Sequence, residues 1–196
     1  MFKLSFLHRD HSVIWTSVLL SCLALVIGLI TLIQPVWAGI NDDRFDGNIF
    51  ALYAGNGSLV PPRVTLAESR ARSRVALLVF FLDDSKDCKQ FVDTISQLQR
   101  YYGTAADFIP VNVDALPSEG VNNAEQAGYY YSGYVPQTVM LNQAGVVVLD
   151  VAGQVSFEAI DDVFRDVFDL LPRSESVELK RRSFNEFNSE LVPSES

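Results

Sequence analysis

The sequence contains few cysteines, since only Cys22 and Cys88 occur among its 196 residues. Cys22 lies in a long apolar stretch near the N-terminus, whereas Cys88 lies in a region of ordinary soluble composition. Two thiols in such different regions are not expected to pair. The globular region therefore has no internal disulfide available to it, which excludes a disulfide-stapled scaffold.

Positive charge is also scarce. The chain has 15 Lys and Arg against 24 Asp and Glu, which gives a formal net charge of −9. An acidic chain does not attract a phosphate backbone, so nucleic acid is excluded as a partner. The one basic cluster, Lys180-Arg181-Arg182, is interpreted as a solvated helix face.

The sequence lacks a recognisable set of metal ligands. Asp42, Asp43 and Asp46 lie close together, but no further ligands follow them at a spacing typical of a metal site. We interpret the three carboxylates as part of a solvated linker. No metal and no other cofactor is expected.

One long hydrophobic run is present, from Val13 to Ile33, and it contains 21 residues without a charge. A helix of this length reaches roughly 30 Å, which is enough to cross the hydrocarbon core of a bilayer. Lys3 and Arg9 precede the run, and positive residues stay on the cytoplasmic side. The sequence therefore predicts a single transmembrane helix, with the globular part in the periplasm or in a thylakoid lumen.

A secretory signal is the alternative interpretation of this segment. Val36-Trp37-Ala38 has small residues at the spacing that a signal peptidase requires, so cleavage after Ala38 is compatible with the sequence. The apolar run is longer than the 7–15 residues typical of the hydrophobic core of a signal peptide, which favours a retained anchor. Both interpretations export the globular part.

The chain divides into four parts by composition. They are a membrane anchor or signal segment over residues 1–38, a linker with a short edge strand at 49–53 over residues 39–64, a folded domain over residues 65–171, and a charged tail over residues 172–196. Phe184, Phe187 and Leu191 in the tail share one helical face. This short amphipathic helix either packs back on the domain or docks on a partner.

Hydrophobic periodicity predicts regular elements throughout residues 65–171. They are a helix over 65–73 with Thr65 as N-cap, a buried strand over 75–82, an amphipathic helix over 86–102, a buried strand over 108–113, a hairpin of strands 137–141 and 146–151, and a helix over 157–171. This order predicts an α/β domain in which helices flank a mixed sheet of four or five strands.

Three local features of this region resemble thioredoxin. An aromatic-rich strand end leads into DDSKDCKQF, in which Cys88-Lys89 matches the second redox cysteine and its lysine. Val135-Pro136 precedes the hairpin, where that fold places its cis-proline. The resemblance covers roughly residues 65–171 and implies a thioredoxin-like fold.

The departures from thioredoxin remove its chemistry. Ser85 stands where the nucleophilic cysteine would be, Asp84 replaces the tryptophan, and Val79 replaces the buried aspartate. Disulfide exchange begins with attack by a thiolate, and a serine hydroxyl is barely ionised at neutral pH. Ser85, Cys88 and Pro136 are therefore interpreted as a degenerate redox site with no catalytic residue. Cys88 is expected to pack as a small hydrophobe.

A thiol-disulfide oxidoreductase that uses Cys88 alone is the competing hypothesis. The helix N-terminus would lower the pKa of Cys88, while neighbouring aspartates would raise it. Reactivity of the Cys88 thiol distinguishes the two hypotheses.

A cluster of tyrosines predicts a binding surface instead. Tyr129, Tyr130, Tyr131 and Tyr134 fall within six residues before the proline loop, and tyrosine is favoured at protein interfaces. In the thioredoxin fold this loop and the start of the first major helix form a groove for extended polypeptide. The predicted partner-binding residues are Asp84, Tyr130, Tyr131, Tyr134 and Val135.

Longer phrases carry a more specific resemblance. The segments DDRFDGNIFALYAGNGSLVPPRVTLAES, ADFIPVNVD, GYYYSGYVPQTV and LLPRSESVELKRRSFNEFNSELV are similar to those of a cyanobacterial family of thylakoid membrane photosystem I accumulation factors. The resemblance runs over residues 41–192. It implies a thylakoid protein that binds photosystem I subunits or assembly intermediates, and it implies no catalytic residues. A structural subunit of a membrane complex is a third hypothesis.

Overall fold

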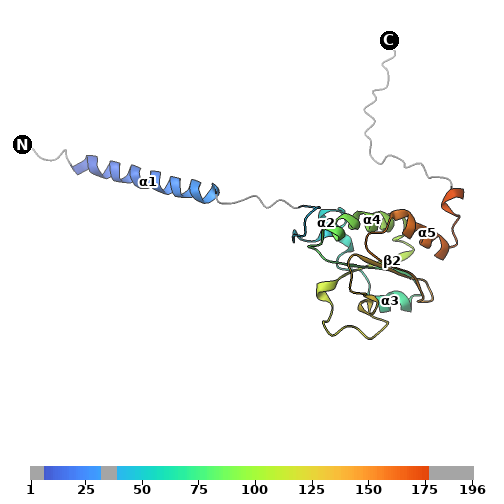
Figure 1. The fold of residues 1–196 in the computed structure, drawn as a ribbon. Coiled ribbons are helices and arrows are strands. Elements are labelled where there is room, and N and C mark those ends of the chain that lie inside the picture. Colours follow the sequence, from blue (N-terminus) through green and yellow to red (C-terminus); the bar gives the residue numbers. More distant parts are fainter. Residues whose placement is uncertain (1–6, 32–38, 177–196) are drawn as a thin grey trace, which may run out of the picture. The chain divides into compact units, whose positions relative to one another are not determined.

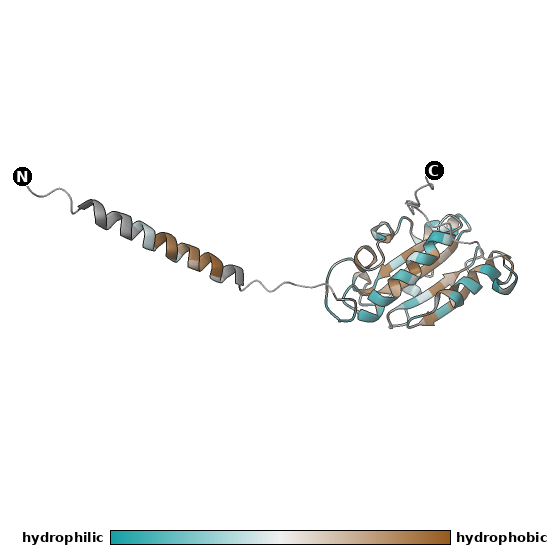
Figure 2. Ribbon diagram, turned by 90° about the horizontal axis from the view of Figure 1, so that it is seen from above, coloured by the Kyte–Doolittle hydropathy of each residue, from teal (hydrophilic) through white to brown (hydrophobic). Residues whose placement is uncertain are grey.

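The computed structural model describes residues 7–31 and 39–176, and these fall into two units that divide after Ala38. The first unit contains helix α1 (Leu7–Thr31), which is largely hydrophobic where its side chains are described (Figure 2). None of the helices in residues 7–31 and 39–176 combines the length and the apolar character that crossing a bilayer requires. The end of the predicted membrane segment at Ile33, the possible cleavage site at Ala38 and the amphipathic tail face at 184–191 lie outside the described residues.

The second unit is built on a four-stranded mixed sheet (Figure 1). Its strands are β1 (Val75–Phe81), β2 (Ala106–Asn112), β3 (Gln137–Leu141) and β4 (Val147–Ala152), in the order β2-β1-β3-β4. β1 is parallel to β2 and antiparallel to β3, and β3 is antiparallel to β4. The predicted mixed sheet is therefore confirmed, with four strands in the described chain.

Helices cover both faces of the sheet unequally (Figure 1). One face carries α2 (Ile49–Leu52), α4 (Lys86–Tyr102) and α5 (Phe157–Val167), while the other carries α3 (Leu66–Ala71). Four 3-10 turns complete the part of this unit that the structure describes, namely η1 (Gly57–Leu59), η2 (Val113–Ala115), η3 (Ala127–Tyr130) and η4 (Arg173–Glu175).

The central strand β1 explains why the two helical layers stay together. All seven of its residues are buried, and they alternate between two apolar clusters, one on each side of the sheet. A continuous apolar run of this kind is typical of a strand covered on both faces. In Figure 2 the helices of this unit carry both hydrophilic and hydrophobic residues, as amphipathic helices over a core do.

The edge strand expected at residues 49–53 is wrong, because this stretch forms helix α2. The Asn48 side chain accepts a hydrogen bond of 3.1 Å from Ala51 N, which caps the helix. Ile49 and Phe50 are both fully buried, and the Phe50 ring packs edge-on against Phe81 at 5.2 Å. Two adjacent residues that bury together fit a helical turn rather than the alternation of a half-buried strand.

Helix α5 ends at Val167, four residues before the predicted end at Leu171. The chain then reverses through Asp169, which has a φ of 53°. Arg165 fixes the segment that follows, since its guanidinium donates to Leu171 O at 2.8 Å and to Ser176 Oγ at 2.6 Å. A side chain near the end of the helix thus holds the segment that follows it.

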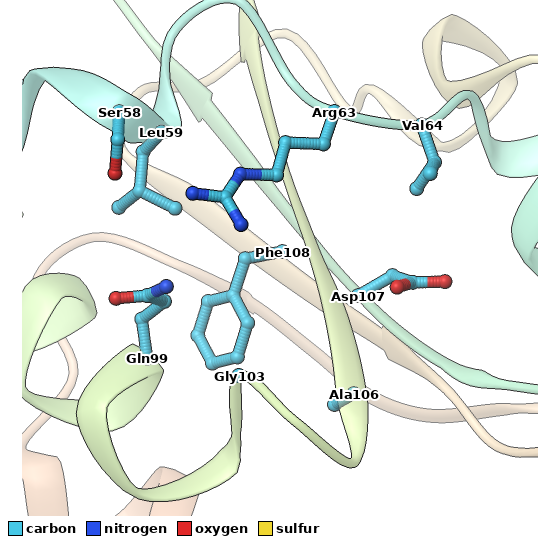
Figure 3. A pocket seen from close by; sticks show the side chains of 9 residues that line it. All are labelled: Ser58, Leu59, Arg63, Val64, Gln99, Gly103, Ala106, Asp107 and Phe108. Carbon is cyan, nitrogen blue, oxygen red and sulfur yellow. The ribbon is translucent and has the colours of Figure 1, made fainter.

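The chain changes sheet face beside β2, the strand at one edge. Leu59 belongs to the cluster under α4, whereas Val64 packs against the cluster under α3. Figure 3 shows a small hollow at this crossing, lined by Arg63 from the crossing segment and by Phe108 from β2. Its volume of about 50 Å³ leaves room for a few water molecules.

Candidate functional site

The predicted site segments meet at one end of the strands because of the strand register. Phe80 pairs with Gln137 and Phe81 pairs with Asn112, so the ends of β1 and β2 lie beside the start of β3. Gly153 N, which follows β4, donates to Pro136 O at 2.7 Å. The segment after β1, the proline loop and the loop after β4 therefore form a common surface, which we call the strand-end face (residues 82–87, 129–136 and 152–154).

Ser85 and Cys88 occupy the first turn of α4. Ser85 is the N-cap residue, and its hydroxyl accepts a hydrogen bond of 3.4 Å from Cys88 N. Cys88 is 1% exposed and belongs to the apolar cluster under α4. Burial raises the pKa of its thiol, and the nearby Asp87 and Asp84 carboxylates act in the same direction. The expected packing of Cys88 as a small hydrophobe is confirmed.

Pro136 is buried, and the Val135–Pro136 peptide bond is cis, as the resemblance to thioredoxin implies. A second cis bond, Val60–Pro61, was not predicted. Val79 is 1% exposed and pairs with Thr138 across β1 and β3. The position where thioredoxin has a buried carboxylic acid is therefore occupied by an apolar side chain in the core.

The five predicted partner-binding residues are exposed to different degrees. Asp84 is exposed, and Tyr134 is 69% exposed at the tip of the proline loop. Tyr130 is half-buried and its hydroxyl donates to a backbone carbonyl at 3.1 Å. Tyr131 is also half-buried, with its ring 5.3 Å from that of Phe80, and Val135 packs against both apolar clusters. Tyr134 and Asp84 are thus the two whose side chains are most available.

Asp83 has an internal structural role. Its carboxylate accepts hydrogen bonds from Ile49 N at 3.2 Å and from Asn112 Nδ2 at 2.9 Å. Burial raises its pKa, although both hydrogen bonds oppose the shift. Asp83 therefore connects the end of β1 to α2 and to the end of β2.

The sequence analysis missed a buried ion pair next to Cys88. Lys89 is fully buried, and its Nζ lies 3.1 Å from each of Gly39 O, Asp42 O and Asp42 Oδ1, and 2.6 Å from each of Arg44 O and Asp46 Oδ2. Five oxygens from residues 39–46 thus surround one ammonium group. The interpretation of the aspartates as a solvated linker is wrong at Asp46, whose side chain is 2% exposed.

Electrostatics at this ion pair favour both charged forms. Hydrogen bonds from Lys89 and then from Tyr53 lower the pKa of Asp46 from 3.8 to about 2, against the effect of burial. Burial acts to lower the pKa of Lys89, but the hydrogen bonds to Asp46 and Asp42 outweigh it and the pKa is raised. A signal in the sequence could have indicated this, because Lys89 shares helical spacing with the buried Val92 and Ser96.

Further contacts bind the same segment to α4. Asp43 Oδ1 accepts from Lys86 N at 2.9 Å, which satisfies a free amide at the helix start. Gln90 Nε2 donates to Asn41 Oδ1 at 3.0 Å. Residues 39–46 are therefore part of the folded unit.

An apolar groove lies on the side of α3. It has a volume of about 670 Å³ and is lined mainly by Val60–Ala67 and Ile109–Asn112, with Leu116 and Ala127 from the loop after β2. No predicted site residue lines it. Among residues 7–31 and 39–176, no cluster of His, Cys, Asp and Glu has the arrangement of a metal site.

Comparison with known proteins matches the chain to one family and to one named relative. A family model described as a thioredoxin-like domain matches residues 62–168. A protein of Synechocystis sp. named "Thylakoid membrane protein slr1796" is 57% identical over 155 residues, which are 79% of this chain and 77% of that protein.

Two thioredoxins are among the solved structures to which this chain is similar. A thioredoxin variant from Halobacterium salinarum is 23% identical, with a TM-score of 0.42, over 55% of this chain and 86% of that one. The germline-specific thioredoxin Deadhead of Drosophila melanogaster is 20% identical, with a TM-score of 0.40, over 50% of this chain and 84% of that one.

Proposed function

The chain belongs to the thioredoxin-like domain family, and on that premise we propose that it is a thylakoid membrane protein that binds other proteins and does not exchange disulfides. Binding takes place through the strand-end face. The domain keeps the shape of a polypeptide-binding fold, while the groups that perform thiol chemistry are absent or buried.

The burial of Cys88 carries this proposal. A thiol must reach a partner's sulfur as a thiolate, but Cys88 is 1% exposed and burial raises its pKa. Ser85, at the position of the first cysteine, acts as a helix cap and cannot resolve a mixed disulfide. These features weigh against the alternative of a monothiol oxidoreductase.

Tyr134 supplies the main contact in the proposed binding surface. Its side chain is 69% exposed, and tyrosine combines a large apolar area with a hydroxyl that can hydrogen-bond. Asp84 is also exposed and lies on the same strand-end face. Its negative charge favours a basic partner segment. The proline loop is held in place by the packing of Tyr130, Tyr131 and Val135 against the apolar core.

The membrane location rests on the relative and on the apolar segment. The Synechocystis protein is named as a thylakoid membrane protein. We propose that Val13–Ile33 anchors this chain in the same membrane by a single helix, and that the thioredoxin-like unit lies in the lumen because Lys3 and Arg9 precede this apolar run.

The cellular role that we propose is support of photosystem I accumulation, by transient contact with its subunits or assembly intermediates. The resemblance over residues 41–192 to photosystem I accumulation factors supports this role. A permanent structural subunit would instead co-purify with the complex at fixed stoichiometry.

The experiment compares photosystem I content in the native organism among four strains. They are the wild type, a full deletion, a Cys88→Ser strain and a Tyr134→Ala strain. We expect the deletion and Tyr134→Ala to lower photosystem I, and Cys88→Ser to leave it normal. A Cys88→Ser strain that behaves like the deletion at unchanged protein level would show that the thiol acts chemically.

Tyr101→Ala is the matched control for this experiment. Tyr101 is 56% exposed, but it lies at the far end of α4 from Ser85, about 24 Å along the helix axis. Loss of photosystem I in both tyrosine variants would indicate a general effect of surface change rather than binding at the strand-end face.

A further inference from the structure

The Lys89 ammonium holds residues 39–46, which precede the stretch that the thioredoxin-like family model matches. An ammonium group has three N–H donors, and Nζ of Lys89 has five oxygens within 3.1 Å, all from residues 39–46. Three of the five oxygens belong to backbone carbonyls. The side chain therefore holds the path of the backbone, and not only one charged partner.

The ion pair at the centre of this contact is shielded from water. The Lys89 side chain is fully buried and the Asp46 side chain is 2% exposed. Asp46 Oδ2 also accepts hydrogen bonds from Tyr53 Oη at 2.7 Å and from Gly39 N at 3.3 Å. A buried charge without its partner is strongly unfavourable, so removal of either group should release the segment.

The same segment continues into the apolar cluster that contains Cys88. Ile49 and Phe50 are fully buried in this cluster, and α2 packs against α4. Ile49 N is further held by Asp83 at 3.2 Å. Residues 39–50, which we call the N-terminal cover, are thus attached by Lys89 at one end and by apolar burial at the other.

We propose that the ion pair and hydrogen bonds of Lys89 keep the N-terminal cover packed over the start of α4. The cover thereby keeps the Cys88 thiol away from solvent. Opening of the cover removes Ile49 and Phe50 from the cluster and gives solvent a route to the thiol. The proposal concerns access to Cys88, and it holds whichever protein binds at the strand-end face.

The test measures the rate at which N-ethylmaleimide alkylates Cys88 in the full-length chain in mild detergent. Cys22→Ser is introduced first, so that Cys88 is the remaining thiol. Lys89→Met keeps the apolar stem and removes the ammonium, and we expect it to raise the alkylation rate by roughly a hundredfold. Lys86→Met is the matched control, since Lys86 is exposed on the same helix, and its rate should equal that of the parent.

Hydrogen exchange identifies which part of the unit opens. Peptides from residues 39–50 should lose most of their protection in Lys89→Met, while peptides from β1 should lose only the part that matches the fall in the free energy of unfolding. Equal alkylation rates in Lys89→Met and the parent, with the cover exchanging freely, would show that the cover does not shield Cys88. Protection factors that fall to the same value in β1 and in the cover would show that no separate cover exists. Asp46→Asn serves the same comparison if Lys89→Met does not fold.

Discussion

The Nζ atom of Lys89 lies 2.6 Å from Oδ2 of Asp46, although 43 positions separate the two residues in the sequence. Both side chains are buried, so the contact joins residues 39–46 to helix α4. The domain limits that the family model suggests, residues 62–168, therefore omit part of the folded structure.

Loss of the ammonium should destabilise the domain. We expect Lys89→Met to lower the free energy of unfolding by about 3 kcal/mol, because Asp46 is left buried without its partner. Urea denaturation followed by circular dichroism measures this change. The exposed Lys86→Met control should stay within about 0.5 kcal/mol of the parent. Equal values for the two variants would mean that the buried pair contributes little.

Acid should weaken the same contact. Hydrogen bonds from Lys89 and Tyr53 lower the pKa of folded Asp46 from 3.8 to about 2. Between about pH 4 and pH 2 the unfolded chain then binds a proton more readily than the folded one, so this part of the stability is lost as the pH falls. Asp46→Asn should show a smaller loss over that range in urea midpoints. Lys89→Met should show the same reduction. If the urea midpoints of both variants fall with pH as steeply as those of the wild type, Asp46 is not the group responsible.

Two tyrosines of the proline loop should separate stability from binding. Tyr131 packs its ring on Phe80, so Tyr131→Ala should cost about 2 kcal/mol of folding free energy. Tyr134 is 69% exposed, so Tyr134→Ala should change stability by less than about 0.5 kcal/mol. Thermal unfolding of the two variants measures the difference. A large loss of stability in Tyr134→Ala would remove the basis for using it as a binding probe.

A second buried carboxylate should hold the segment after α5. Asp161 is 3% exposed and accepts hydrogen bonds from the Tyr102 hydroxyl and from Arg165, with Arg173 paired to it at 2.9 Å. Asp161→Asn should cost about 2 kcal/mol, because Arg165 and Arg173 lose their shared charge. Asp162→Asn, with a side chain that is 60% exposed, is the matched control and should cost much less. Limited proteolysis after residue 171 should be faster only in the first variant.

The regular elements of the unit could be predicted from hydrophobic periodicity. The expected helix over 86–102 and the strand over 137–141 agree with α4 and β3 residue for residue. Thr65 caps α3 in a capping box with Glu68, as its spacing indicated. These features depend on local pattern, which a single sequence contains.

The features that were missed depend on contacts between distant parts of the chain. Nothing near Asp46 indicates a lysine 43 positions later, and the buried position of Lys89 is visible only as a helical spacing shared with Val92. The apolar run over residues 49–53 predicts a strand where the structure has helix α2, because a run of five apolar residues does not distinguish the two structures. In the candidate site, the strand-end position of Tyr134 and Pro136 followed from the resemblance, but the internal use of Asp83 did not.

The two edges of the sheet also affect how the protein behaves at high concentration. Exposed strand edges are where copies of a protein join into aggregates. On one edge, β2 contains Pro110, which has no N–H to offer to an added strand. On the other edge, the pairing of β3 with β4 is irregular between Met140 and Leu141, and such irregularities bend a strand away from regular pairing. Each edge thus carries a feature that discourages the addition of a strand from another copy.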